Sequence, residues 1–177
     1  MTYNSLDKLF YTIFVSTTID FYINLGMTPN QVTTLSVICS ILSIYYLFYR
    51  NKLYCCIFIF LRHYFDCVDG HLARTTNQVT ELGDMYDHLN DFTFGISFII
   101  SIYMLSKTPK LDITIYVISM IIAVIGYSCY LKHAPKNETI GRESLELFKN
   151  WCIYKEVLGK GGIIISYFPM FWIIYKL

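Results

Sequence analysis

Residues 53–74 read LYCCIFIFLRHYFDCVDGHLAR, an apolar run that becomes acidic before it ends. A helix of about 20 residues, long enough to cross a bilayer, would run from Leu53 to near Leu72. Its last two turns would then carry Asp66 and Asp69. The stretch therefore predicts a membrane helix that brings acidic side chains to one face of the membrane.

The composition of the whole chain supports a membrane environment. Of its 177 residues, 55% are hydrophobic and 15% are charged, whereas a soluble domain carries about 25% charged residues. The charges lie between apolar runs, which is typical of a membrane protein. The length predicts a single domain over residues 1–177. A net charge of +1 gives no reason to expect a nucleic-acid partner.

The remaining apolar runs predict an all-α, polytopic bundle of about five to six spans. The turns at 50–52 and 107–110 are so short that the chain must reverse there. We expect four spans and a fifth of about minimum length, at 32–49, 53–72, 83–105, 111–131 and 161–177. Residues 144–158 are predicted either to form an interfacial helix or to belong to a shortened bundle.

The ends of the chain predict the arrangement around this bundle. Residues 1–27 combine apolar positions at helical spacing with charged residues, which predicts an amphipathic interfacial helix before a bundle formed by 28–177. Thr28 is a candidate cap for a helix with Pro29 in its first turn. The segment 132–160 is richer in Lys and Arg than the opposite turns, so we expect the aspartate side to face the cytoplasm. The six cysteines are expected to be free thiols, and no cleavable signal peptide is evident.

Two pairs of aspartates are the candidate chemical groups. Asp66 and Asp69 are three residues apart, and Asp87 and Asp91 are four apart, so each pair projects from one face of a helix. The short connection makes the two helices antiparallel neighbours, and the pairs can therefore meet. Insertion of an ionisable side chain into a membrane span costs about 2.5 to 3.5 kcal/mol, so four such acids are not expected to face lipid without a compensating interaction. A divalent cation would supply one, and oxygen ligands favour two Mg²⁺ or Mn²⁺ ions.

Neighbouring residues suit a phosphate ligand. Gly70 and Ala73 would leave the helix face open, and Arg74 could pair with phosphate oxygens. Asp84, after Gly83, is interpreted as a helix cap. His71 and His88 are expected to make local hydrogen bonds. Arg62 is expected either to reach the membrane interface or to bind an anionic lipid head group.

The pattern D-x-x-D-G-x-x-A-R-x8-G-x-x-x-D-x-x-x-D, which covers residues 66–91, resembles the signature of the CDP-alcohol phosphatidyltransferase family at all eight fixed positions. Thr28-Pro29-Asn30 and Thr33 are similar to the segment that opens the family's first span. The resemblance implies an integral membrane enzyme of phospholipid synthesis that transfers a substituted phosphate from a CDP-linked donor to a small alcohol acceptor and releases CMP. Many members of the family have six spans, which is more than the four and a possible fifth that the apolar runs predict here.

The resemblance also implies the residues' roles. Asp66, Asp69 and Asp87 would bind metal, Asp91 would be the general base and could also touch metal, and the CDP group would contact Asn30, Gly70, Ala73 and Arg74. The segment from Asp69 to Gln78 is most similar to phosphatidylinositol and phosphatidylglycerophosphate synthases, which favours CDP-diacylglycerol as donor. Leu82-Gly83 with Asp87-His88 is instead similar to choline and ethanolamine phosphotransferases, which use a CDP-alcohol and diacylglycerol.

Other interpretations stay open. The endoplasmic reticulum and the plasma membrane are the expected locations, and a homodimer remains an option. A membrane prenyltransferase would need a second aspartate-rich motif, but the sequence has no Asp after Asp112. A metal-binding channel or transporter would place acids at midplane depth on several helices. An inactive scaffold can be excluded only by assay.

Overall fold

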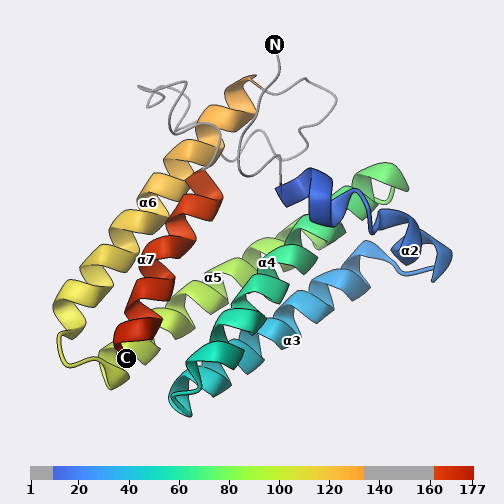
Figure 1. Cartoon of the computed structure of the whole chain (residues 1–177). Helices are drawn as coiled ribbons and strands as arrows, with labels where there is room; N and C mark the ends of the chain where they lie inside the picture. Colours follow the sequence, from blue (N-terminus) through green and yellow to red (C-terminus); the bar gives the residue numbers. More distant parts are fainter. Residues whose placement is uncertain (1–9, 134–161) are drawn as a thin grey trace.

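The computed structural model describes residues 10–133 and 162–177, and within these ranges every regular element is a helix (Figure 1). Two short helices, five residues of π-helix and six of α-helix, precede five long ones. In chain order they are η1 (Tyr11–Val15), α2 (Ile19–Asn24), α3 (Pro29–Phe48), α4 (Lys52–Thr75), α5 (Glu81–Leu105), α6 (Pro109–His133) and α7 (Gly162–Lys176). The predicted all-helical fold is confirmed for the described residues.

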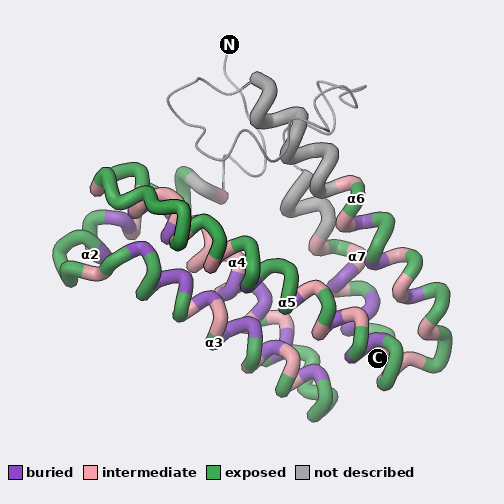
Figure 2. Tube along the Cα trace, turned by 180° about the vertical axis from the view of Figure 1, so that it is seen from behind, coloured by how far each residue is buried: buried purple, intermediate pink, exposed green. Residues whose placement is uncertain are grey.

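Helices α3, α4 and α5 form one group, and α6 and α7 form a pair that contacts α5 and α4. Small polar residues of α3, namely Ser36, Ser40 and Ser43, are buried. They lie near α4 and α5, since Ser36 bonds to Arg62 and Ser40 to Asn90. Small side chains allow helix backbones to approach closely, as they do between membrane helices. Figure 2 shows buried residues along the lines where these helices meet and exposed residues on their outer faces.

Side-chain caps fix where three of the helices begin. Thr28 and Gln31 form a capping box at the start of α3, with Pro29 in its first turn, as the sequence predicts. Asn51 caps α4, and Thr80 caps α5 by accepting a hydrogen bond from the Gly83 amide. The interpretation of Asp84 as the cap is therefore wrong. Asp84 lies within the first turn of α5, where its charge favours the helix N-terminus.

The N-terminal segment differs from the single helix that its sequence predicts. Within residues 10–28 the chain forms η1 and the short α2. The hydroxyls of Thr17 and Thr18 donate to the carbonyl oxygens of Ile13 and Phe14, at 2.5 and 2.7 Å. Such local bonds compete with helix continuation, so the two threonines account for the break. Both short elements pack against α4.

The apolar residues form two buried clusters and a large exposed outer surface. One cluster contains residues from all five long helices, α3 through α7. The other cluster joins the N-terminal elements to α3 and α4. Large side chains on the outer faces are exposed, including Ile41, Phe92 and Tyr103, while Arg62 and Asn90 are buried. Apolar side chains outside and polar side chains inside suit a lipid environment.

Two described helices, α3 and α5, are long and apolar enough to cross a membrane. The other predicted crossings, the single domain over 1–177 and the interfacial position of the N-terminal segment stay predictions. Cys39, Cys55 and Cys56 are free thiols, as expected. The prediction for 144–158 and most of the basic segment 132–160 lie outside the described residues.

Candidate functional site

The predicted site residues gather at one end of the bundle, where α3 begins, α4 ends and α5 begins. The tight turn at 49–51 sends α4 back beside α3, and the loop at 76–80 returns the chain into α5. The last turns of α4 and the first turns of α5 therefore lie beside the first turns of α3. This topology brings residues that are distant in sequence to the same end of the molecule.

Three of the four predicted acids form a cluster between α4 and α5. Asp66, Asp87 and Asp91 each offer a carboxylate oxygen, and these oxygens all lie within 4.8 Å of one another. Among the described residues, the Oδ1 atoms of Asp66 and Asp87 are buried and have no hydrogen-bond partner. Buried carboxylate oxygens without donors are costly. A hard divalent cation would satisfy them, so the cluster fits the predicted metal.

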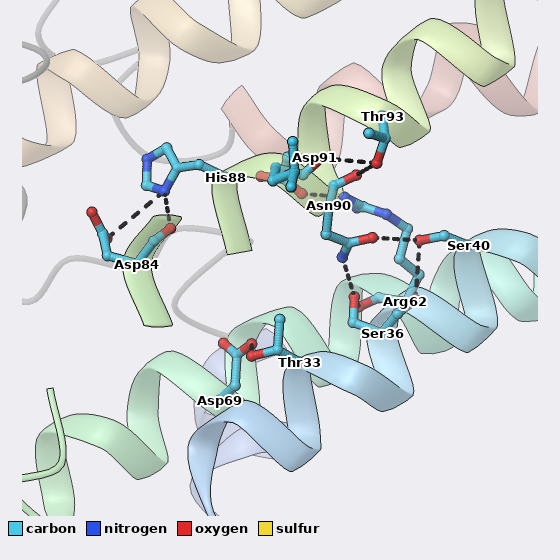
Figure 3. A network of polar contacts seen from close by, with 11 residues as sticks. Thr33, Ser36, Ser40, Arg62, Asp69, Asp84, His88, Asn90, Asp91 and Thr93 are labelled. Carbon is cyan, nitrogen blue, oxygen red and sulfur yellow. Dashed lines mark hydrogen bonds and ion pairs between the residues drawn. The ribbon is translucent and has the colours of Figure 1, made fainter. Parts of the chain in front are cut away.

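Asp69 lies beside this cluster but is held by a different contact. Its side chain is buried, and its Oδ2 accepts a hydrogen bond of 2.5 Å from the Thr33 hydroxyl of α3. The same hydroxyl is 3.2 Å from the Pro29 carbonyl oxygen. Figure 3 shows Thr33 and Asp69 facing each other across the two helices. Asp69 is thus positioned by the start of α3, a contact that the spacing of the aspartates could not predict.

A cavity beside the acids is lined by all four residues predicted to contact the donor. Its walls contain Asn30 of α3, Gly70, Ala73 and Arg74 of α4, together with Asp69 and Asp87, and it is completed by Pro29, Thr33, Gln78, Val79, Thr80, Gly83 and Asp84. The N-termini of α3 and α5 both border it. Helix N-termini favour negatively charged groups. The cavity therefore combines an acidic side suited to a metal with an arginine and two helix ends suited to phosphate.

Gly83 lies in the tightest part of this cavity. A Cβ atom at this position would be 2.9 Å from Asn30 Oδ1 and 3.0 Å from Thr80 Oγ1. A side chain there would displace either the residue predicted to contact the donor or the helix cap. At Gly70 a Cβ would be 3.3 Å from Arg74 Nη1, which is a tight contact with a flexible side chain. Glycine at 83 is therefore the more stringent requirement.

Arg62 reaches the acidic cluster, contrary to both interpretations of its sequence position. The side chain is buried, and its Nη2 donates to Asp91 Oδ1. The centre of the guanidinium lies 4.5 Å from the centroid of the Phe94 ring. Figure 3 shows Arg62 extending from α4 towards Asp91 on α5. Sequence reasoning missed this partner because the residues are 29 positions apart; the only available signal was a cation one turn before Asp66.

His71 on α4 and His88 on α5 are the two histidines nearest to the site residues in the sequence. His88 Nδ1 lies 2.8 Å from the Asp84 carbonyl oxygen, which confirms the local bond expected for it (Figure 3). The predicted hydrogen bond of His71 stays a prediction. A second, largely aromatic cavity lies between Phe10, α4 and α7 and is lined by Phe10, Ile59, Phe60, His63, Tyr167, Phe168 and Phe171.

Comparison with known proteins gives one family match and several curated relatives. A family model described as CDP-alcohol phosphatidyltransferase matches residues 26–173. Human ethanolaminephosphotransferase 1 is 30% identical over 80 residues, which are 45% of this chain and 20% of that protein. The archaetidylinositol phosphate synthase of Pyrococcus horikoshii is 32% identical over 68 residues, or 38% of this chain and 36% of the relative. The CDP-diacylglycerol–serine O-phosphatidyltransferase of Bacillus subtilis is 36% identical over 70 residues, or 39% and 40%.

The matched segments thus span between 20% and 40% of the lengths of these relatives. No solved structure gives a significant match.

Proposed function

Because the chain belongs to the CDP-alcohol phosphatidyltransferase family, we propose that it transfers a substituted phosphate from a CDP-linked donor to an alcohol and releases CMP. One observation carries the proposal: the cavity lined by Asn30, Gly70, Ala73 and Arg74 also contains Asp69 and Asp87. A phosphate-binding wall and an acidic wall meet in one space. This arrangement suits a pyrophosphate that must be bound and neutralised together.

The acids supply the metal-binding side of the site. Asp66 and Asp87 have buried oxygens that point to a cation, and Asp69 lines the same cavity while Thr33 fixes its orientation. We propose that these residues, with Asp91 close by, hold two Mg²⁺ or Mn²⁺ ions. Bound ions would neutralise the pyrophosphate and stabilise the charge that develops on the leaving phosphate.

The remaining side chains orient the donor. Arg74 can offer its guanidinium to phosphate oxygens, and Gly70 lets a ligand approach the α4 backbone. Asn30, whose Oδ1 lies beside Gly83, presents a side-chain amide for hydrogen bonding to the nucleotide. These contacts would keep the bond between the two phosphates facing the acids.

Asp91 is the proposed general base. Its side chain is 53% exposed, so an acceptor hydroxyl can reach it. In the reaction, the hydroxyl oxygen forms a bond to the β-phosphorus and the bond from that phosphorus to the bridging oxygen breaks. CMP leaves with the bridging oxygen, and Asp91 receives the hydroxyl proton.

Two donor classes have separate support. The signature from Asp69 to Gln78 favours CDP-diacylglycerol, which agrees with the name of the Bacillus subtilis relative. The similarity to human ethanolaminephosphotransferase 1 favours a CDP-alcohol with diacylglycerol as acceptor. The two reactions would use the same cavity and the same bond cleavage. Assays with both classes of donor are therefore needed to distinguish them.

The experiment is an assay of CMP release by purified protein in mixed micelles with Mg²⁺ or Mn²⁺. One set would offer CDP-diacylglycerol with inositol, glycerol 3-phosphate or serine, and the other CDP-choline or CDP-ethanolamine with diacylglycerol. We expect metal-dependent release from one donor class, lowered by about 100-fold or more in Asp91→Asn. Release from none of these pairs by folded protein, or equal release by Asp91→Asn, would contradict the proposal.

We further propose that the chain lies in the membrane of the endoplasmic reticulum or in the plasma membrane, with its cavity on the cytoplasmic side. We also propose that it works as a homodimer. The excess of Lys and Arg in 132–160 supports the orientation. Crosslinking in native membranes would test the dimer.

A further inference from the structure

We propose that Arg62 is a positioning residue that holds the Asp91 carboxylate in place between α4 and α5. The inference rests on the proposed function, since it assigns Arg62 a part in the same reaction. It starts from the contact between the Arg62 guanidinium and Asp91 Oδ1.

The two side chains differ greatly in exposure. The Arg62 side chain is 6% exposed, whereas that of Asp91 is 53% exposed. A buried guanidinium depends on its partner, but a half-exposed carboxylate can still be hydrated. The pair is therefore asymmetric: Arg62 requires Asp91 for its burial, while Asp91 obtains from Arg62 a fixed direction.

Two contacts on one face of α5 fix the guanidinium. Asp91 accepts its hydrogen bond, and the Phe94 ring, three residues later, lies under its planar group. Cations are attracted to aromatic faces, and arginine stacks there well. A lysine would keep the charge but would lack the planar group that contacts both residues.

Helix α3 restrains both sides of this pair. Ser36 donates to the Arg62 carbonyl oxygen at 3.2 Å, and Asn90 Nδ2 donates to Ser36 Oγ at 3.0 Å. Ser40 donates to Asn90 Oδ1 at 3.2 Å. Figure 3 shows this chain of contacts leading from Arg62 through Ser36 to the residue next to Asp91. The backbone of Arg62 and that of Asp91 are thus tied to a common support.

The aspartates of the acidic cluster therefore have different roles. Asp66 and Asp87 each have a buried Oδ1 without a partner among the described residues, whereas Asp91 Oδ1 is bonded to Arg62. The first two are available for an ion, while Asp91 is held for its contact with the acceptor. Arg62 also adds a positive charge one turn before Asp66, which opposes cation binding. Its removal should therefore impair transfer while it strengthens metal binding.

The test compares Arg62→Met, Arg62→Lys, Asp91→Asn and the double variant Arg62→Met/Asp91→Asn in micelles. Lys107→Met is the control, because it removes an exposed cation at the opposite end of α5. Thermal unfolding should show a large decrease in midpoint for Asp91→Asn, a smaller one for Arg62→Met, and recovery in the double variant. Mn²⁺ titration should show binding several-fold tighter in Arg62→Met and unchanged in Lys107→Met.

Kinetics supply the third readout. Arg62→Met should lower kcat by about 10- to 100-fold, with little change in KM for the donor. Arg62→Lys should recover part of kcat, and the double variant should be no slower than Asp91→Asn alone. No recovery of stability in the double variant, unchanged Mn²⁺ affinity in Arg62→Met, or multiplicative losses of kcat would overturn the inference. An inactive wild-type chain would instead refute the proposed function, while stability and Mn²⁺ binding would still test the pairing.

Discussion

Gly83 has the least space for a side chain among the described glycines, because Asn30 and Thr80 would lie at 2.9 and 3.0 Å from a Cβ atom added there. We expect Gly83→Ala to weaken binding of CDP by about tenfold, since Asn30 must move out of the cavity. Isothermal titration with CDP and Mn²⁺ would measure this. Gly95→Ala on the same helix is the matched control, because its Cβ would meet Tyr116 at an ordinary 3.7 Å. Equal affinity in both variants would show that Asn30 does not contact the nucleotide.

The hydrogen bond from the Thr33 hydroxyl to Asp69 Oδ2, at 2.5 Å, can also be tested by substitution. Thr33→Val keeps the shape of the side chain and removes the donor. Partners that orient metal ligands typically contribute about 10- to 100-fold in affinity, so we expect a loss of Mn²⁺ affinity near the lower end of that range. Thr114→Val, which removes a hydroxyl bonded to the Lys110 carbonyl on α6, is the control. A normal titration curve for Thr33→Val would argue against Asp69 as a ligand.

At this scale the sequence predicts residues that share a helix better than residues that meet across helices. The spacing of Asp66, Asp87 and Asp91 predicts that they approach one another, and they do. The contacts of Thr33 with Asp69 and of Arg62 with Asp91 depend on how α3, α4 and α5 pack. No periodicity within one helix contains that information.

Among the elements, α7 is fastened to the end of the bundle opposite the cavity. Lys176 Nζ lies 2.8 Å from Asp112 Oδ1 on α6, and Asp112 is buried. Arg50, in the turn after α3, and Lys52, the first residue of α4, donate to carbonyl oxygens near the end of α7. These contacts join three segments far from the acidic cluster.

We therefore expect Asp112→Asn to lower stability by about 2 kcal/mol, because it weakens the hydrogen bonds that Lys176 and two hydroxyl groups donate to this buried carboxylate. Thermal unfolding in micelles would measure the change. Affinity for Mn²⁺ should stay the same, since the cavity is at the other end. A decrease in Mn²⁺ affinity with little change in stability would contradict this separation.

The boundaries of the long helices can be predicted closely because their signals are local. Thr28 with Pro29 marks the start of α3, and the 49–51 turn has too few residues for anything other than a reversal. The single N-terminal helix predicted over residues 1–27 is not confirmed. Within the described part of that range the chain forms η1 and α2, and the bonds of Thr17 and Thr18 to preceding carbonyl oxygens favour the break between them.

At the scale of the whole molecule, we expect the two ends of α5 to lie on opposite sides of a membrane. Glu81→Cys and Lys107→Cys, each in a background without native cysteines, would place a thiol at exposed positions near these ends. In sealed vesicles whose cytoplasmic side faces outward, a membrane-impermeant maleimide should label Glu81→Cys, and Lys107→Cys only after permeabilisation. Labelling of both from the same side would contradict the crossing by α5, and the reverse pattern would contradict the cytoplasmic orientation.

The central claim is that the acids of α4 and α5 and the cavity beside them form one metal-dependent nucleotide site. The most direct test is calorimetric titration of CDP into the wild-type chain and Asp87→Asn, with Mn²⁺ and with chelator. We expect saturable binding by the wild type only when Mn²⁺ is present, and no saturable binding by Asp87→Asn. CDP binding of equal strength without metal, or in Asp87→Asn, would show that the acids and the cavity do not act as one site.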